Sequence, residues 1–567
     1  MKSFFRNPSC LVAVELFLFC AHLSAQTNPV SPRIAQSVEE TNLVRLEGNV
    51  HPLVQAKYDQ GAVSDAKMIN RMLLLLRRSE EQEASLKDLL DEQQMKSSAN
   101  YHHWLTPEEF GKRFGPADAD IQVVTDWLTS KGFEGIKVGV GRVVIEFRGN
   151  AGQVRRAFHT EIHNYFVNGE EHFANASDPQ IPVVLAPVVA GVVALHNFPK
   201  QSQIHHLGTF KRTKGTGEVQ PEFTYISCGS TGTRPCYALG PSDFATIYGV
   251  QKLWDTGIDG TGQTIAIVGE TNLNIQDVRD FRKIFGLPAN DPQVILNGPD
   301  PGITSKSEET EADLDVEWSG AVAKNATIKF VVSESTVSNA TAGVDLSALY
   351  IIENNIAPVM SESYGACEAS LGTTGNKFYR DLWQQAAAQG ITVIIAAGDN
   401  GTAACDTASG QTSASHGLAV SGLASTPYNV ALGGTDFYYT SANPATNYWN
   451  DANSNNSTTG QSAKSYIPET TWNDSCAQNG GTGCGSVHSN GRDLIAGSGG
   501  QSNCSTLNSA DTACTAGYAK PGWQSGTGVP KDGVRDIPDV SLFASNGANN
   551  SFTLCAKQTR SIATRAA

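Results

Sequence analysis

The chain has 567 residues, which is too long for a single hydrophobic core and predicts two or three domains. Its net charge of −15 argues against nucleic acid as a partner. Glycine is abundant and charged residues make up only 17% of the chain, a composition typical of secreted proteins with long loops.

The first residues have the pattern of a secretory signal. The basic residues Lys2 and Arg6 precede a largely apolar run over 11–23, and small residues for cleavage follow. We therefore predict a signal peptide over residues 1–25 and a secreted, extracellular protein. No later stretch is long and apolar enough to span a bilayer, so no membrane contact is expected after signal removal.

The use of cysteine agrees with export. No cysteine occurs between Cys20 and Cys228, and nine follow from there on. Sequence spacing does not fix connectivity, but it suggests four bridges: Cys228–Cys236, Cys367–Cys405, Cys476–Cys484 and Cys504–Cys514. Cys555 is left over, and we expect its partner to lie beyond residue 567.

Residues 40–200 form a cysteine-free first unit that mixes strands and helices. Thr106, followed by Pro107 and Glu109, has the pattern of a capped helix start. Strands are expected over 67–76, 143–147 and 161–167, and helices over 80–95, 118–131 and 152–158. This order predicts a compact, ferredoxin-like α+β domain with an antiparallel sheet.

Residues 201–227 are polar and basic, and we predict a linker that a protease would cut. From about residue 240, apolar strands alternate with helices. Strands are expected over 264–268, 327–332, 358–361, 392–396 and 429–432, and helices over 275–285 and 381–388. This alternation predicts an α/β unit whose mostly parallel sheet is covered on both faces. Residues 440–530 are expected to be loop-like.

An acidic run stands before one of these strands. Glu311 and Asp315 are four residues apart, so a helix would place both carboxylates on one face. Two like charges this close raise one pKa, which suits a general base that works in acid. The alternative is a solvated acidic helix start, since Asp and Glu favour a first turn.

A further acid follows the strand over 392–396. Asp399 lies between two glycines at a strand end, which is where parallel sheets carry their active sites. It could be a neutral acid that donates a hydrogen bond to a developing oxyanion. The alternative is a plain turn residue.

Several motifs together resemble the sedolisin (serine-carboxyl) peptidase family, in its kumamolisin-like group with a propeptide. The acid pair Glu311 and Asp315 matches, and so does Ala396-Ala397-Gly398-Asp399. Further matches are Ser361 to Gly365, Ala424 to Tyr428 with Gly433-Gly434-Thr435, Glu469 to Trp472 and Arg535 to Ser541. Upstream, residues 101–115 and 152–198 resemble the pro-kumamolisin activation domain.

The resemblance implies a subtilisin-like, doubly wound fold and peptide-bond cleavage at acidic pH. Glu311 would be the general base on a serine, Asp315 would support Glu311, and Asp399 would stabilise the oxyanion. Partners would be protein or peptide substrates and the chain's own propeptide, which would be an inhibitor and folding aid. The signal peptide would cover residues 1–25, the activation domain 40–200, the linker 201–227 and an incomplete catalytic domain 228–567. His416 and His488 are expected to be loop residues.

The family's nucleophilic serine lies in a Gly-Thr-Ser-x-x-x-Pro motif, and this sequence contains no Gly-Thr-Ser. The segment Ser525-Gly526-Thr527-Gly528 is better read as a turn, and Ser541 belongs to a strand. We therefore expect a truncated or frame-shifted chain that cannot perform acylation. The calcium of complete relatives would lose its site too, because its ligands follow the serine.

Two other functions compete with an inactive proenzyme. One is a secreted, non-catalytic fragment that binds peptides or inhibits full-length relatives. The other is a glycosidase that uses Glu311 and Asp315, which is disfavoured because a glycosidase needs its two carboxyls on opposite sides of the substrate.

Overall fold

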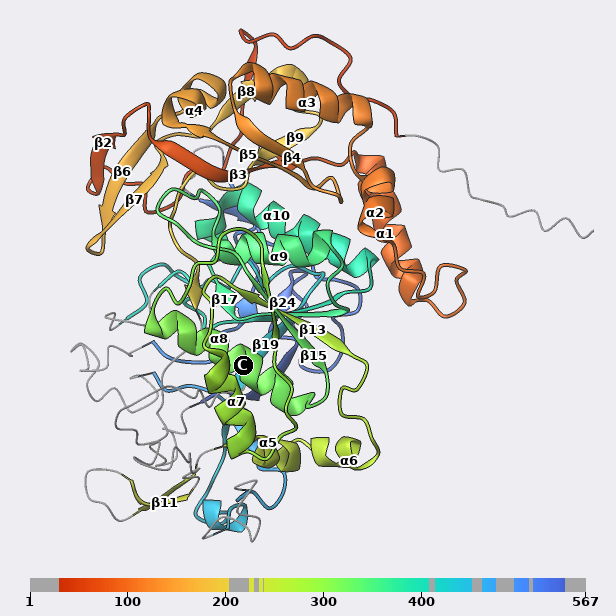
Figure 1. Cartoon of the computed structure of the whole chain (residues 1–567), viewed down its shortest axis with the longest axis vertical. Helices are drawn as coiled ribbons and strands as arrows, with labels where there is room; N and C mark the ends of the chain where they lie inside the picture. The colour runs from red at the N-terminus through yellow and green to blue at the C-terminus, as the bar shows by residue number, and fades with distance from the viewer. Residues whose placement is uncertain are drawn as a thin grey trace, which may run out of the picture.

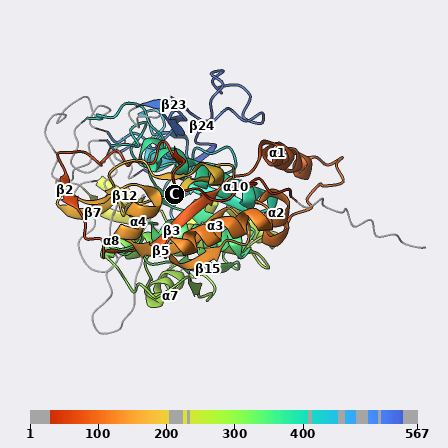
Figure 2. The same cartoon turned by 90° about the horizontal axis from the view of Figure 1, so that it is seen from above.

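The computed structural model describes residues 30–202, 224–228, 234–237, 239–406, 413–450, 461–475, 494–508 and 513–545. Two units follow one another along the chain, and the N-terminal unit lies over the helices of the C-terminal unit (Figure 1 and Figure 2). Among the helices of these residues, none has the length and apolar character that a membrane span requires.

The N-terminal unit is built on an antiparallel sheet of order β4-β5-β3-β9. Its strands are β3 (Met68–Leu76), β4 (Glu134–Val138), β5 (Val144–Asn150) and β9 (Val189–Val192). Its helices are α1 (Glu80–Gln94), α2 (Pro107–Phe114), α3 (Asp118–Ser130) and α4 (Ala151–Phe158). The predicted α+β unit is therefore present, and Thr106 caps α2 with the expected box to Glu109.

Smaller strands complete this unit. A second sheet joins β2 (Asp59–Ala62), β6 (Ile162–Val167) and β7 (Glu170–Asn175), while β1 (Leu43–Arg45) pairs with β8 (Gln180–Pro182). A 3-10 turn, η1 (Val183–Leu185), leads into β9.

Strand β3 is buried on both faces, which explains its unbroken run of large apolar residues. Leu74 and Leu76 pack in the core of the N-terminal unit, beneath α3 and α4. Leu73 and Leu75 point the other way and pack with residues of the C-terminal unit. Because side chains alternate along a strand, one strand serves both cores.

The C-terminal unit contains an eight-stranded sheet of order β14-β15-β13-β16-β18-β19-β20, with β25 on the flank of β19. All pairs are parallel except that of β20 with β19. The strands are β13 (Thr264–Gly269), β14 (Gln293–Leu296), β15 (Thr327–Val332), β16 (Val359–Glu362), β18 (Thr392–Ala396), β19 (Val430–Phe437), β20 (Glu469–Thr471) and β25 (Val540–Phe543). The α/β prediction with a mostly parallel sheet is confirmed.

Helices cover both faces of this sheet (Figure 1). Ile267 packs with α7 (Ile275–Ile284) and α8 (Lys306–Val322), whereas its neighbours Ala266 and Val268 pack toward α9 (Gly343–Glu353) and α10 (Glu368–Ala388). The short helices α5 (Pro241–Ile247) and α6 (Val250–Asp255) lie beyond α8. Such double cover is what a parallel sheet requires.

Three predictions about local structure need correction. Helix α10 begins at Glu368 and not at 381, because Gly372, with φ 67°, breaks its first turns and hides the helical pattern. The edge strand β14 was not predicted, since its exposed residues show no alternation. Residues 201–202 of the expected linker form strand β10 (Gln201–Ser202).

The expected loop region 440–530 contains short elements. They are η2 (Ala445–Asn447), β20, β21 (Gly500–Gln501), β22 (Thr506–Leu507) and β23 (Cys514–Ala516), and β21 pairs with β24 (Asp536–Ile537). The predicted bridges Cys367–Cys405 and Cys504–Cys514 are present. Upstream, β11 (Thr224–Cys228) pairs with β12 (Arg234–Tyr237). The cysteine side chains of the other two predicted bridges, and Cys555, lie outside the described residues.

Candidate functional site

The predicted acid pair lies on α8, which passes beside the sheet on the side opposite α9 and α10. Ser305 begins the helix, and its side chain accepts a hydrogen bond from the backbone N–H of Glu308. Glu311 lies six residues after Ser305 and is only 1% exposed, while Asp315 is partly buried. The alternative of a solvated acidic helix start is therefore wrong for Glu311.

Each acid of the pair accepts a hydrogen bond from a serine. The hydroxyl of Ser202 donates to Glu311 Oε2 over 2.7 Å, and that of Ser363 donates to Asp315 Oδ1 over 2.7 Å. Burial and then the charge of Asp315 raise the pKa of Glu311 well above its usual range, against the bond from Ser202. Burial also raises the pKa of Asp315 to about 7, although the bond from Ser363 opposes the rise.

Asp399 lies in the loop that leaves the carboxyl end of β18. Gly398 takes a φ of 112° there, a backbone conformation that favours glycine. The charge of Asp399 contributes to the raised pKa of Glu311, so the structure brings all three predicted acids into one electrostatic group.

Further acids join this group that the sequence reasoning did not single out. Glu308 accepts a hydrogen bond of 2.8 Å from the hydroxyl of Tyr364. Burial raises the pKa of Glu270, which directly follows β13, to about 7. Glu362, at the end of β16, is 1% exposed, and burial raises its pKa well above the usual range. Their position at the ends of neighbouring parallel strands is the signal that could have found Glu270 and Glu362.

The end of the N-terminal unit reaches into this acidic group. Strand β10 pairs antiparallel with β17 (Tyr364–Gly365), and this pairing brings Ser202 to Glu311. Two residues earlier, Lys200 Nζ lies 3.6 Å from a carboxylate oxygen of Asp345. A cation and a hydroxyl from the first unit therefore contact acids of the second.

The other sequence candidates have plainer roles. His416 is exposed and contacts Asp406 over 2.8 Å in a loop, which confirms its reading as a loop residue. His488 lies outside the described residues. The segment 525–528 contains a turn, and Ser541 lies within β25. One group of acids away from this site, Asp277, Glu309 and Asp313, could hold a metal ion.

Comparison with known proteins identifies the first unit. Residues 55–198 match the family model "Pro-kumamolisin, activation domain". Sedolisin from Pseudomonas sp. (strain 101) is 27% identical over 471 residues, which cover 82% of this chain and 69% of sedolisin. The chain carries a pro-kumamolisin activation domain and is a homologue of sedolisin.

Two other peptidases show the same relationship. Xanthomonalisin from Xanthomonas sp. (strain T-22) is 29% identical over 60% of this chain, which spans only 42% of the length of xanthomonalisin. Kumamolisin from Bacillus sp. (strain MN-32) is 25% identical over a region that covers 74% of this chain and 72% of the length of kumamolisin. Among solved structures, Pseudomonas sedolisin, described as a serine-carboxyl proteinase in complex with pseudo-iodotyrostatin, is 26% identical, with a TM-score of 0.39 over 55% of this chain and 72% of that one.

Proposed function

We propose that this sedolisin homologue is the proenzyme of a secreted serine-carboxyl endopeptidase that acts in acid. The observation that carries the proposal is the state of Glu311: it is buried, lies one helical turn from Asp315 on α8, and already accepts a hydrogen bond from a serine hydroxyl. Release of the propeptide, whose Ser202 contacts Glu311, would expose this carboxyl and lower its pKa toward the ordinary value of about 4.3. Glu311 could then accept a proton at an acidic pH at which a histidine base, with an ordinary pKa of about 6.5, would already be protonated.

The proposed roles follow from the chemistry of acyl transfer. A serine oxygen would attack the carbonyl carbon of the peptide while its proton passes to Glu311. Asp315 would hold Glu311 in place and share its charge. Asp399, in its neutral form, would donate a hydrogen bond to the oxyanion. Collapse of the tetrahedral intermediate would then return the proton from Glu311 to the leaving amine.

The propeptide is proposed as the resident inhibitor of this site. Strand β10 lies extended along β17 and places the hydroxyl of Ser202 on Glu311, so it occupies the position that a substrate strand would need. Activation would require a cut in the proposed linker, 201–227, between the proposed activation domain over 40–200 and the catalytic domain over 228–567. A signal peptide over 1–25 would direct export.

The sequence contains no Gly-Thr-Ser, so the serine on which Glu311 would act is not identified. We therefore propose that this 567-residue polypeptide does not perform acylation itself. The calcium site that the family resemblance places after that serine also remains a prediction, and no step above depends on it.

A chimera tests the proposed acids directly. Residues after 545 are replaced by the corresponding segment of Pseudomonas sedolisin, and hydrolysis of a denatured protein is followed at about pH 3–5. We expect the chimera to be active after propeptide release and Glu311→Gln to lower its rate at least about 100-fold. The control Asp255→Asn, at an exposed position of α6 in the proposed catalytic domain, should leave the rate unchanged.

The outcomes separate the two parts of the proposal. Activity that survives Glu311→Gln would overturn the assignment of the base. If the unaltered chain is itself active and Glu311→Gln abolishes that activity, the assignment of the acids would stand. Only the proposed lack of acylation would then be overturned.

A second candidate function is peptide binding without cleavage, which the pairing of β10 with β17 favours. It predicts that a chain cut after residue 202 and freed of its propeptide binds extended peptides with Glu311 intact. Absence of binding to a peptide copy of residues 198–206 would contradict it.

A further inference from the structure

Helix α8 carries two rows of acids on opposite faces. Glu311 and Asp315 form the row described above. Glu309, Asp313 and Glu317 form a second row, each four residues after the last. Because two residues turn an α-helix by about 200°, the second row points away from the first. It faces α7, which packs against α8.

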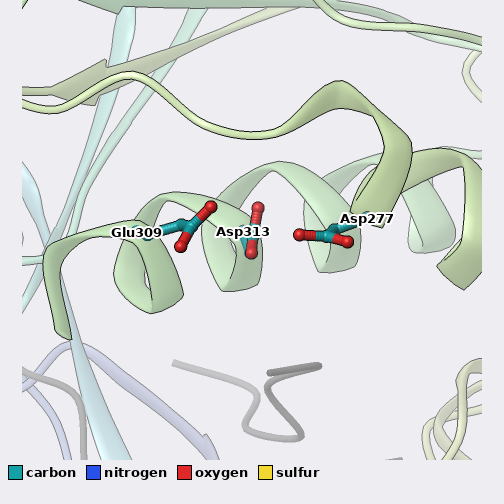
Figure 3. A group of neighbouring side chains, drawn as sticks. All are labelled: Asp277, Glu309 and Asp313. Atoms are coloured by element: carbon teal, nitrogen blue, oxygen red, sulfur yellow. The ribbon is translucent and has the colours of Figure 1, made fainter. Parts of the chain in front are cut away.

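The second row meets a carboxylate from the neighbouring helix. Asp277 lies in the first turn of α7, just after the N-cap residue Asn274. Carboxylate oxygens of Asp277, Glu309 and Asp313 all lie within 4.8 Å of one another. Figure 3 shows Asp313 between Glu309, on the same helix, and Asp277, on α7.

The buried members of this row lack donors. Asp313 is 1% exposed and Glu317 is fully buried, yet none of their four oxygens has a hydrogen-bond partner among the described residues. Burying an ionised carboxylate without compensation is costly. Asp313 and Glu317 therefore need a partner that the described residues do not provide.

Other buried carboxylates of the same unit show the usual solution. Glu368 accepts hydrogen bonds from Ser425, from Ser502 and from the backbone N–H groups of residues 503 and 504. Asp243 accepts three backbone N–H groups. Asp313 and Glu317 differ from both.

The described arginines of α7 are directed elsewhere. Arg279 pairs with Asp291 over 2.6 Å. Arg282 donates to the carbonyl oxygens of Pro288, Gly320 and Lys324, so its guanidinium is engaged with the backbone. Neither guanidinium donates a hydrogen bond to Asp313 or Glu317.

We propose that Asp277, Glu309 and Asp313 bind a calcium ion between α7 and α8, with Glu317, one helical turn after Asp313, as a further source of negative charge. Oxygen-only ligands select hard cations. Calcium bonds oxygen at about 2.3–2.6 Å, so oxygens on opposite sides of the ion are about 4.6–5.2 Å apart, which suits this spacing. Such an ion would tie α7 to α8, and α8 carries Glu311 and Asp315 on its other face.

The test uses the full-length chain at pH 7.5. Calcium chloride is titrated into protein freed of metal with a chelator, and both the heat of binding and the melting temperature are recorded. We expect one ion to bind with a dissociation constant of about 10⁻⁵–10⁻³ M and to raise the melting temperature. Asp313→Asn should weaken binding at least about 10-fold and abolish the thermal shift.

The melting temperatures of the variants without metal give a second test, because the change expected there has the opposite sign. Without metal, Asp313→Asn should melt at a higher temperature than the wild type, because it removes one of several close carboxylates. Asp277→Asn, on the other helix, should also lose the calcium response and guards against a folding defect in the first variant. The control Asp255→Asn, at an exposed position of α6, should bind as the wild type does.

Two results would overturn the proposal. The first is the absence of calcium binding by the wild type up to about 10 mM, well above the weakest affinity expected. The second is calcium binding that persists unchanged in Asp313→Asn and Asp277→Asn, which would place the ion elsewhere in the chain.

Discussion

The two units differ in the kind of buried group whose pKa is shifted most by burial. In the N-terminal unit, three histidines gather around Phe198: the rings of His51, His172 and His196 lie 4.3, 4.6 and 5.5 Å from its ring. In the C-terminal unit, the buried groups are carboxyls, with Glu311 and Glu362 among them. Burial favours the neutral form in both units, but acid neutralises a carboxylate and charges a histidine.

Acid should therefore weaken the N-terminal unit. Burial lowers the pKa of His51 well below its usual range and that of His196 to about 3. The Nδ1 atoms of both rings accept backbone N–H bonds, which the protonated ring cannot do. Because the unfolded chain binds these protons first, stability present above pH 6.5 is lost as the pH falls toward 3.

The carboxyls act in the opposite direction. Burial raises the pKa of Asp315 to about 7 and that of Glu311 and Glu362 well above their usual range. The folded state then holds protons that the unfolded state releases above its ordinary pKa of about 4. The C-terminal unit should gain stability as the pH falls from about 7 to 4. The comparison indicates a chain whose two units respond to acid with opposite sign.

The largest effect should appear when the two units are followed separately through a pH change. Hydrogen exchange of β6 and β7, which pack with Phe198, should become faster between pH 6.5 and 4, while that of β13 and β15 should become slower after correction for intrinsic rates. His196→Asn keeps an acceptor near Nδ1 and cannot be protonated, so it should reduce the acid sensitivity by a few kcal/mol at pH 4. Equal loss of protection in both units would contradict the comparison.

A buried ion pair should hold the units together with little pH dependence. Arg78, from the N-terminal unit, lies 2.9 Å from Asp381 on α10, and both side chains are buried. Burial opposes ionisation of Asp381, but the charges of Arg78, Lys377 and Arg380 hold its pKa well below the usual range. The stability that this pair contributes is therefore present above the unfolded pKa of 3.8 and should not change between pH 7 and 4.

Arg78→Ala should lower the free energy of unfolding by about 3 kcal/mol at both pH values, as measured by denaturant titration. The control Arg148→Ala removes an exposed ion pair with Glu134, 3.5 Å long, and should cost no more than about 0.5 kcal/mol. A loss for Arg78→Ala that vanishes at pH 4 would show that Asp381 is protonated there.

Sequence patterns predicted the elements whose causes are local. The run of leucines in β3 and the alternation of strands and helices after residue 240 gave both fold classes, because burial on two faces leaves a continuous apolar signature. The start of α10 escaped prediction, since Gly372 and its threonine neighbours weaken the helical pattern.

The residues of the candidate site also divide into those whose relation is local in the sequence and those that only the fold brings together. Glu311 and Asp315 were predictable because their relation is one helical turn within α8. Ser202 could not be predicted as a partner of Glu311, because 109 residues separate them and only the pairing of β10 with β17 brings them together. Burial of Glu362 likewise depends on strands and helices far away in the sequence.

The smallest expected effect tests whether a buried carboxyl without partners destabilises the fold at neutral pH. Neither oxygen of Glu362 has a hydrogen-bond partner among the described residues. Burial, and then the charge of Asp345, raise the pKa of Glu362, while Lys200 lowers it. Glu362→Gln should therefore raise the free energy of unfolding by about 1 kcal/mol at pH 7.5 and leave it unchanged at pH 4, where both side chains are neutral.

Glu368 provides the matched control, because it is equally buried but accepts four hydrogen bonds. Glu368→Gln should lower the free energy of unfolding by at least about 2 kcal/mol at pH 7.5, since its amide nitrogen cannot accept the bonds of the oxygen that it replaces. Opposite signs for two buried Glu→Gln changes would show that partners, and not burial alone, decide the cost of an acid in this unit. A loss of stability for Glu362→Gln as well would mean that Glu362 is ionised and paired.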